Sequence, residues 1–128
     1  MNYLNTLNYG NKMLRNNNIS SYQLDSELLL AKVLNKTREE ILINLKDKLE
    51  AYKFNKFKKL LIRRKQNEPL AYIFRQKEFW KYNFFVNKDV LIPRPETEII
   101  VEEVLKLTKN KSPKNFLEVG TGSGCLII

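Results

Sequence analysis

Apolar residues recur at helical spacing through the first half of the chain, and capping or polar residues separate the repeats. This periodicity predicts four short amphipathic helices. Their expected apolar positions are Leu4, Leu7 and Leu14; Leu24, Leu28, Leu29 and Leu34; Ile41, Leu42 and Leu45; and Phe54, Phe57, Leu60 and Leu61. Helices of this length bury their apolar sides against one another, so the pattern predicts a helical bundle over residues 1–75.

Local signals place the ends of these helices. Ser20 or Ser21 can cap the second helix, and Thr37 with Glu40 matches a capping box before the third. The fourth helix is expected from about Glu50 to Lys65. Its outer side is strongly basic, which is most simply a solvated helix surface and alternatively an RNA-binding face. The basic residues are Lys53, Lys56, Lys58, Lys59, Arg63, Arg64 and Lys65.

The pattern changes after Pro69, which suits the first turn of a short helix through Ile73. Two aromatic runs follow, at 78–80 and 84–86, with Lys81-Tyr82-Asn83 between them, and they predict a β-hairpin. Ile92-Pro93-Arg94-Pro95 favours extended backbone, because a residue before proline avoids helical geometry. Residues 76–94 are therefore expected to form a hairpin linker.

A further helix is predicted to open at Pro95 or Glu96, with Ile99, Ile100, Val104 and Leu107 on its apolar side, and a polar loop follows over Lys109–Lys114. Asn115–Val119 then has the pattern of a buried strand. Gly120-Thr121-Gly122-Ser123-Gly124 follows directly, and Cys125–Ile128 is expected to begin a helix. Residues 95–128 thus predict the start of a Rossmann-like α/β domain.

The glycine loop is the main candidate site. Glycines after a strand let the backbone turn sharply and approach a ligand closely, and small hydroxyls add hydrogen-bonding groups without bulk. Glu118 lies just before the loop, where a carboxylate disfavours a pyrophosphate but suits a zwitterionic or cationic ligand. A glycine-rich turn without a ligand is the simpler alternative. The loop is not a P-loop, because no Gly-Lys-Ser/Thr follows.

Composition excludes several kinds of chemistry. The 128 residues contain no histidine and one cysteine, Cys125, which excludes a Ser-His-Asp or Cys-His mechanism, an intrachain disulfide and a cysteine-cluster zinc site within this chain. We expect no metal site. No apolar run approaches about 18 residues and the start lacks the pattern of a signal peptide, so we expect a cytoplasmic protein that does not span a membrane.

The net charge is +9, which fits a surface facing RNA or an acidic partner. The codon bias of an AT-rich genome explains it equally well, because lysine, asparagine and isoleucine are all abundant.

Together, several motifs closely resemble the HemK/PrmC family of S-adenosylmethionine-dependent N5-glutamine methyltransferases. The matching stretches are Glu68–Ile73, Glu78–Trp80, Val86–Asn87, Val90–Glu98 with its Ile-Pro-Arg-Pro-Glu-Thr-Glu run, and Leu117–Cys125. The resemblance implies methyl transfer to the glutamine of the Gly-Gly-Gln motif in peptide chain release factors. It implies S-adenosylmethionine as cofactor, bound by Glu118, Gly120, Thr121, Gly122, Ser123 and Gly124. It also implies that the helical bundle helps to recognise the release factor, with a monomer expected and no nucleic acid required.

The family's catalytic Asn-Pro-Pro-Tyr motif does not occur in these residues, so no catalytic residue is assigned. We therefore expect an incomplete fragment that is inactive alone. Its last apolar residues would be an exposed tail without the neighbours that normally bury them. A non-catalytic module that binds a release factor or the ribosome, and a methyltransferase acting on a ribosomal-protein glutamine, stay open as alternatives. The roles of Arg94 and Glu96 also stay open.

Overall fold

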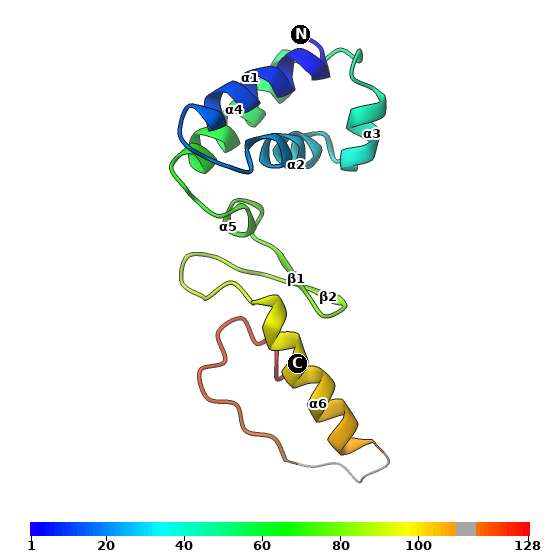
Figure 1. Cartoon of the computed structure of the whole chain (residues 1–128), viewed down its shortest axis with the longest axis vertical. Coiled ribbons are helices and arrows are strands. Elements are labelled where there is room, and N and C mark those ends of the chain that lie inside the picture. The colour runs from blue at the N-terminus through cyan, green and yellow to red at the C-terminus, as the bar shows by residue number, and fades with distance from the viewer. Residues whose placement is uncertain (110–114) are drawn as a thin grey trace. The chain divides into compact units, whose positions relative to one another are not determined.

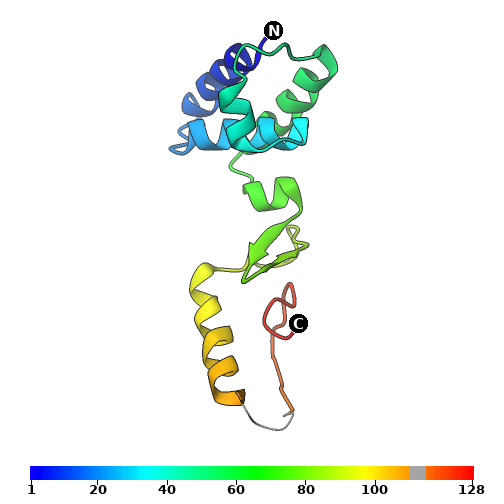
Figure 2. The ribbon, with the colours of Figure 1, turned by 90° about the vertical axis from the view of Figure 1, so that its right-hand side faces the viewer.

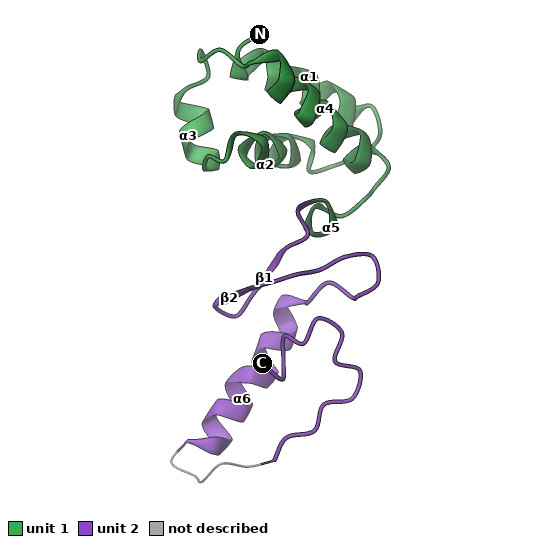
Figure 3. Cartoon of the chain, turned by 180° about the vertical axis from the view of Figure 1, so that it is seen from behind, with its two compact units in different colours: residues 1–73 green, residues 74–128 purple. Residues whose placement is uncertain are grey.

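The computed structural model describes residues 1–109 and 115–128, which divide into two compact units, 1–73 and 74–128 (Figure 3). The first unit contains α1 (Tyr3–Arg15), α2 (Tyr22–Leu34), α3 (Arg38–Ile43) and α4 (Ala51–Lys65). Helices α1, α2 and α4 pack against one another in pairs, and α3 packs on α2 (Figure 1). The predicted four-helix bundle is thereby confirmed.

The core of this unit follows the predicted apolar pattern with exceptions. Leu14, Leu29, Ile41, Phe57 and Leu61 are fully buried. The prediction was wrong for residues at the edges of the apolar stripes, which face solvent where no neighbouring helix covers them. These are Leu4, Leu24 and Leu42, which are 44%, 44% and 38% exposed.

The third helix is shorter than predicted. It ends at Ile43, so Leu45 lies in the following turn, where its carbonyl accepts a hydrogen bond of 3.0 Å from the N–H of Leu4. Leu49 donates its N–H to Met1 O at 2.8 Å. The α3–α4 connection is therefore held against the start of α1 by backbone hydrogen bonds.

Helix capping agrees with the sequence at α3 and differs at α2. The N–H of Glu40 donates to Thr37 Oγ1 at 3.2 Å and the N–H of Thr37 donates to Glu40 Oε2 at 2.6 Å, which confirms the capping box. Ser21 occupies the N-cap position of α2 but makes no capping hydrogen bond. Its hydroxyl donates to the buried carboxylate of Asp25, at 2.9 Å from Oδ2.

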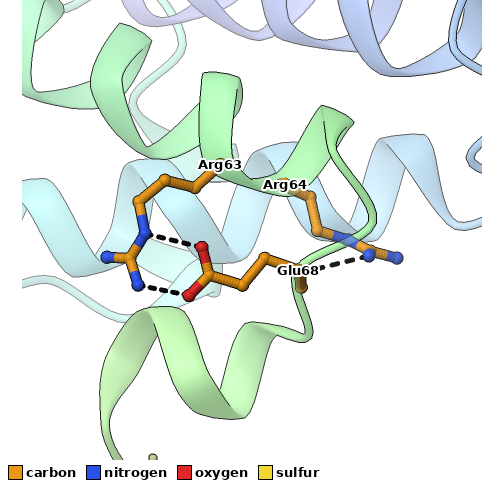
Figure 4. A network of polar contacts seen from close by, with 3 residues as sticks. All are labelled: Arg63, Arg64 and Glu68. Carbon is orange, nitrogen blue, oxygen red and sulfur yellow. Dashed lines mark hydrogen bonds and ion pairs between the residues drawn. The ribbon is translucent and has the colours of Figure 1, made fainter. Parts of the chain in front are cut away.

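The basic side of α4 is not a uniformly solvated surface, since two of its arginines are paired. Arg64 Nε donates to Asp25 Oδ2 of α2 at 2.7 Å, where the side chains are only 17% and 5% exposed. Arg63 holds Glu68 through two bonds, Nε to Oε2 at 2.7 Å and Nη2 to Oε1 at 2.5 Å (Figure 4). The Arg64 guanidinium also reaches the Glu68 carbonyl at 3.2 Å. These arginines join α4 to α2 and to the residues that lead into α5.

The predicted short helix is α5 (Leu70–Phe74) and the predicted hairpin is β1 (Lys77–Phe79) with β2 (Tyr82–Phe84) (Figure 2). The strands pair antiparallel, with Lys77 opposite Phe84 and Phe79 opposite Tyr82. The predicted strand limits were wrong. Trp80 and Lys81 form a two-residue turn in which Trp80 has a φ of +56°, so Tyr82 and Asn83 belong to the second strand.

The chain then makes a turn at Lys88-Asp89, where the Val90 N–H donates to Asn87 O at 3.2 Å, and continues to a 3-10 turn, η1 (Pro95–Thr97), which leads into α6 (Glu98–Thr108). The helix was expected to begin at Pro95 or Glu96; the 3-10 turn begins at Pro95, and the α-helix itself begins at Glu98. The predicted apolar side of α6 is largely uncovered, with Ile99, Ile100 and Leu107 61%, 52% and 64% exposed. Of the predicted loop Lys109–Lys114, only Lys109 lies within the described residues.

Two predictions for the last segment were wrong. Asn115–Val119 is not a strand, and Leu117 and Val119 are 91% and 89% exposed. A parallel strand needs neighbours, and the hairpin is the only sheet that the structure contains within residues 1–109 and 115–128. Cys125–Ile128 forms turns instead of a helix, with one helix-like hydrogen bond from the Ile128 N–H to Gly124 O at 3.2 Å. The described residues therefore form a helical bundle and a hairpin, and they do not include a Rossmann-like sheet.

Candidate functional site

The glycine loop adopts the backbone geometry that its sequence predicts. Gly120, Gly122 and Gly124 have φ angles of +77°, +56° and +78°, in the region that disfavours side chains. The Gly124 N–H donates to Thr121 O at 2.8 Å and closes a tight turn. A Cβ on Gly120 would meet nothing within 4 Å, so this backbone is open to a ligand, whereas a Cβ on Gly124 would lie 3.1 Å from Ile128 Cδ1.

Glu118 is a half-buried carboxylate just before this loop. Its Oε2 atom is buried without a hydrogen-bond partner. A buried carboxylate oxygen without a donor is costly, and a hydroxyl or cationic group from a ligand would satisfy it. The site thus contains both an open glycine backbone and an unsatisfied acceptor.

The structure does not bring all the predicted site residues into one hollow. Gly122 and Ser123 line an open pocket of about 890 Å³ with β2 and the segment that follows it. Glu118 lines an adjoining groove of about 620 Å³ with α6 and Trp80, and this groove shares Tyr82, Phe84 and Ile128 with the pocket. In the described residues, the carboxylate and the glycine turn are therefore neighbours in sequence that face different spaces.

One hydrogen bond that the sequence did not predict joins the hairpin to α6. The Trp80 N–H, at the left-handed turn position, donates to Glu98 Oε1 at 2.7 Å. No local sequence signal identifies the hairpin as the partner of Glu98. The contact fixes the hairpin turn beside one wall of the groove that contains Glu118.

The side chains of Arg94 and Glu96, whose roles the sequence left open, are exposed. Within residues 1–109 and 115–128, no group of three or more acidic or cysteine side chains is placed to hold a metal ion. Among the helices of the described parts, none has the length and apolar character needed to cross a membrane.

Comparison with known proteins links the chain to one group of methyltransferases. Residues 5–74 match the family described as the PrmC N-terminal domain. A release factor glutamine methyltransferase of Leptospira interrogans is 42% identical over 124 residues, which cover 96% of this chain and 43% of the relative. One from Clostridium botulinum is 44% identical over 117 residues, or 91% of this chain and 41% of the relative. A bifunctional methyltransferase of Rickettsia conorii is 41% identical over 134 residues, covering 86% and 26%. The chain thus spans less than half the length of these relatives.

Proposed function

Because the chain belongs to the PrmC N-terminal domain family, we propose that it is the N-terminal part of a release factor glutamine methyltransferase. The observation that carries this proposal is the extent of the similarity. The match to the family covers residues 5–74, while the relatives with that name align over 91–96% of the chain, so the similarity continues past residue 74 and into the hairpin. The same segment in a longer bifunctional methyltransferase shows that it also occurs in proteins of other lengths.

The proposed reaction moves a methyl group to the side-chain amide nitrogen of a glutamine in a release factor. That nitrogen is a poor nucleophile, because its lone pair is delocalised into the carbonyl. The enzyme must therefore hold the amide in line with the methyl donor and stabilise the charge that develops. Residues that perform this task are not assigned in this chain, since the Asn-Pro-Pro-Tyr motif does not occur in it.

The residues present fit part of a site for S-adenosylmethionine, which supplies an activated methyl group when bound. The open backbone of Gly120–Gly124 would accept its amino-acid and ribose portion, with Thr121 and Ser123 as hydrogen-bonding hydroxyls. Glu118 would accept hydrogen bonds through the oxygen that now has no partner. The cytoplasm, where release factors act, is the proposed location.

Each segment has a proposed role in this enzyme. Residues 1–75 would recognise the release factor, 76–94 would link the domains, and 95–128 would begin the Rossmann-like domain. The two parts of the cofactor site face different spaces here, and no neighbouring strand orders residues 115–119. We infer that the chain alone neither methylates a release factor nor binds the cofactor tightly.

The test begins with the coding sequence beyond the codon for Ile128. An open frame that encodes an acidic residue after a second strand and then Asn-Pro-Pro-Tyr is the expected result. The protein encoded by that frame should transfer a labelled methyl group from S-adenosylmethionine to a release factor, and replacing the Gly-Gly-Gln glutamine should abolish the transfer. Transfer to a ribosomal protein instead would contradict the proposed substrate. Robust transfer by the 128-residue chain would contradict the proposed inactivity.

A further inference from the structure

Helix α4 presents exposed residues to which no individual role has been given above. Tyr52, Lys56 and Lys59 follow one another at intervals of four and three residues, so they form one line on the outer side of the helix. We call this line the α4 stripe. Phe57 and Leu61, on the opposite side, are fully buried in the core. The stripe is therefore held on a packed helix and faces solvent.

The first unit carries positive charge that its own acidic residues largely leave uncompensated. Residues 1–73 contain fourteen lysines and arginines against seven aspartates and glutamates, a net charge of +7. Four of the acidic residues are already engaged in ion pairs, with Arg38, Lys53, Arg63 and Arg64. Among the described residues, no acidic side chain forms an ion pair with Lys56 or Lys59. The α4 stripe therefore carries positive charge that is available to an anionic partner.

Tyr52 indicates what kind of anion fits. The residue is 52% exposed, and the ammonium groups of Lys53 and Lys56 lie 5.7 Å and 5.5 Å from the centroid of its ring. An aromatic ring beside lysines can stack on an unpaired base while the lysines contact the adjoining phosphates. An acidic protein surface would use the lysines but gain little from the ring.

We propose that the α4 stripe binds single-stranded nucleic acid, with Lys56 and Lys59 on the phosphates and Tyr52 stacked on a base. From Tyr52 to Lys59 the stripe covers seven helical steps, or about 10 Å at a rise of about 1.5 Å per residue. That length matches two or three phosphates of a stacked strand at roughly 3.4 Å per nucleotide. This proposal does not rest on the proposed methyl transfer.

The test uses the 128-residue chain and a fluorescein-labelled 12-nucleotide oligouridine, with binding followed by anisotropy across a salt series. The Lys56→Gln, Lys59→Gln double variant is expected to bind at least about tenfold more weakly at low salt. Its slope of log affinity against log salt should fall by about 1.4, since each phosphate contact on a single strand contributes about 0.7. The matched control is Lys46→Gln, Lys48→Gln, which removes two exposed lysines from the α3–α4 connection and should change binding much less.

Tyr52 separates nucleic acid from a general polyanion site. Tyr52→Phe should retain binding, whereas Tyr52→Ala should weaken it by about fivefold or more, the low end of the stacking contribution of about 1 kcal/mol per base. Circular dichroism should show unchanged helix content in every variant. Equal losses from the control pair and the stripe pair would overturn the proposal in favour of diffuse charge. A poly-glutamate chain that binds as tightly as the oligonucleotide, with no effect of Tyr52→Ala, would assign the stripe to an acidic protein instead.

Discussion

Gly10 lies on α1 where this helix packs against both α2 and α4. A Cβ built on this α1 residue would lie 2.9 Å from Phe57 Cζ of α4 and 2.9 Å from Ser26 Oγ of α2. Both neighbours are fully buried, so neither can move aside freely. Glycine inside a helix costs about 1 kcal/mol relative to alanine, and its presence here indicates that close packing outweighs this cost.

We therefore predict that Gly10→Ala destabilises the first unit by about 1–2 kcal/mol, because the strain of overpacking exceeds the gain in helix propensity. Urea unfolding followed by far-ultraviolet circular dichroism measures the change. Asn8→Ala, at an exposed position of the same helix, is the control and should be neutral or stabilising. Gly10→Ala should cost less stability in a chain that already carries Phe57→Leu than in the original chain, because the smaller leucine leaves room for the added methyl group. A Gly10→Ala variant that is more stable than the original chain would show that Phe57 and Ser26 yield easily.

Arg63 and Glu68 give the first unit a measurable dependence on pH. The two hydrogen bonds from Arg63 to the Glu68 carboxylate lower the pKa of Glu68 below its ordinary value of 4.5 (Figure 4). The same contact raises the pKa of Arg63. Since the carboxylate pKa is lower in the folded state, its stabilisation is fully present above about pH 5. It is lost as the pH falls through the folded pKa.

We predict that Glu68→Gln lowers the free energy of unfolding at pH 7 by less than about 1 kcal/mol, because the two side chains are 31% and 40% exposed and solvent screens the pair. The difference between variant and original chain should shrink as the pH is lowered from 5 toward 3. Urea titrations at pH 7, 5 and 3 measure it, with Glu39→Gln, at an exposed position on α3, as the control. A difference that is the same at all three values would assign the effect to something other than the charge.

Among the ion pairs in the described residues, the most buried joins Asp25 on α2 with Arg64 on α4. The residues are 39 positions apart, and Asp25 Oδ2 accepts both from Arg64 and from the Ser21 hydroxyl. A buried charge that loses its partner leaves the other charge without compensation, which costs far more than losing an exposed pair. This ion pair also explains why the Arg64 side chain is largely buried although the sequence pattern placed it on the solvated side of α4.

We predict that Asp25→Asn destabilises the first unit by about 3 kcal/mol, since the Arg64 guanidinium then lacks its carboxylate. Replacing Arg64 with methionine in the same chain should recover part of that loss, because both charges are then removed. Glu27→Gln is the control, since it breaks the more exposed pair with Arg38 and should cost less than about 1 kcal/mol. Chemical unfolding measures all four proteins. Equal small losses from Asp25→Asn and Glu27→Gln would contradict a special role for the buried pair.

The elements that the sequence predicted well are those set by local chemistry. The Thr37–Glu40 capping box and the periodicity of α4 depend on residues within one or two helical turns, and both were found. The hairpin was predicted, but its strand limits were wrong, because the turn uses Trp80 in a left-handed conformation without the usual glycine or asparagine. The prediction of a strand at 115–119 was wrong for a different reason, since a parallel strand is ordered by neighbours distant in sequence.

In the candidate site, too, local backbone geometry could be predicted, whereas contacts between distant segments could not. The positive φ angles of Gly120, Gly122 and Gly124 could be predicted, because only glycine takes them readily. The separation of Glu118 from the glycine turn, and the hydrogen bond of Glu98 to the hairpin, could not be predicted. Both depend on how α6 and the hairpin pack, which local sequence does not determine.

At the scale of the whole chain, the last segment exposes much apolar surface. Phe116, Leu117, Val119, Ile127 and Ile128 are 56%, 91%, 89%, 47% and 91% exposed, as expected for an uncovered tail. Contiguous exposed apolar surface of this kind promotes association between molecules. Part of the tail also lines the groove beside Ile100 and Val104 of α6. Removing the tail therefore removes its exposed apolar surface but uncovers the apolar side of α6 that lines the groove.

We predict that the loss of exposed tail surface has the larger effect, because Leu117, Val119 and Ile128 are 91%, 89% and 91% exposed, more than any α6 residue that lines the groove. A chain ending at Lys114 should remain soluble at higher concentration than the 128-residue chain and should bind less of a hydrophobic fluorescent dye. Leu117→Lys with Val119→Lys is the matched control, since it keeps the backbone and removes only exposed apolar surface, and it should improve solubility in the same direction. If the shortened chain aggregates more while the double lysine variant aggregates less, then the tail's main effect is to cover α6, and the groove is a packed interface of the second unit.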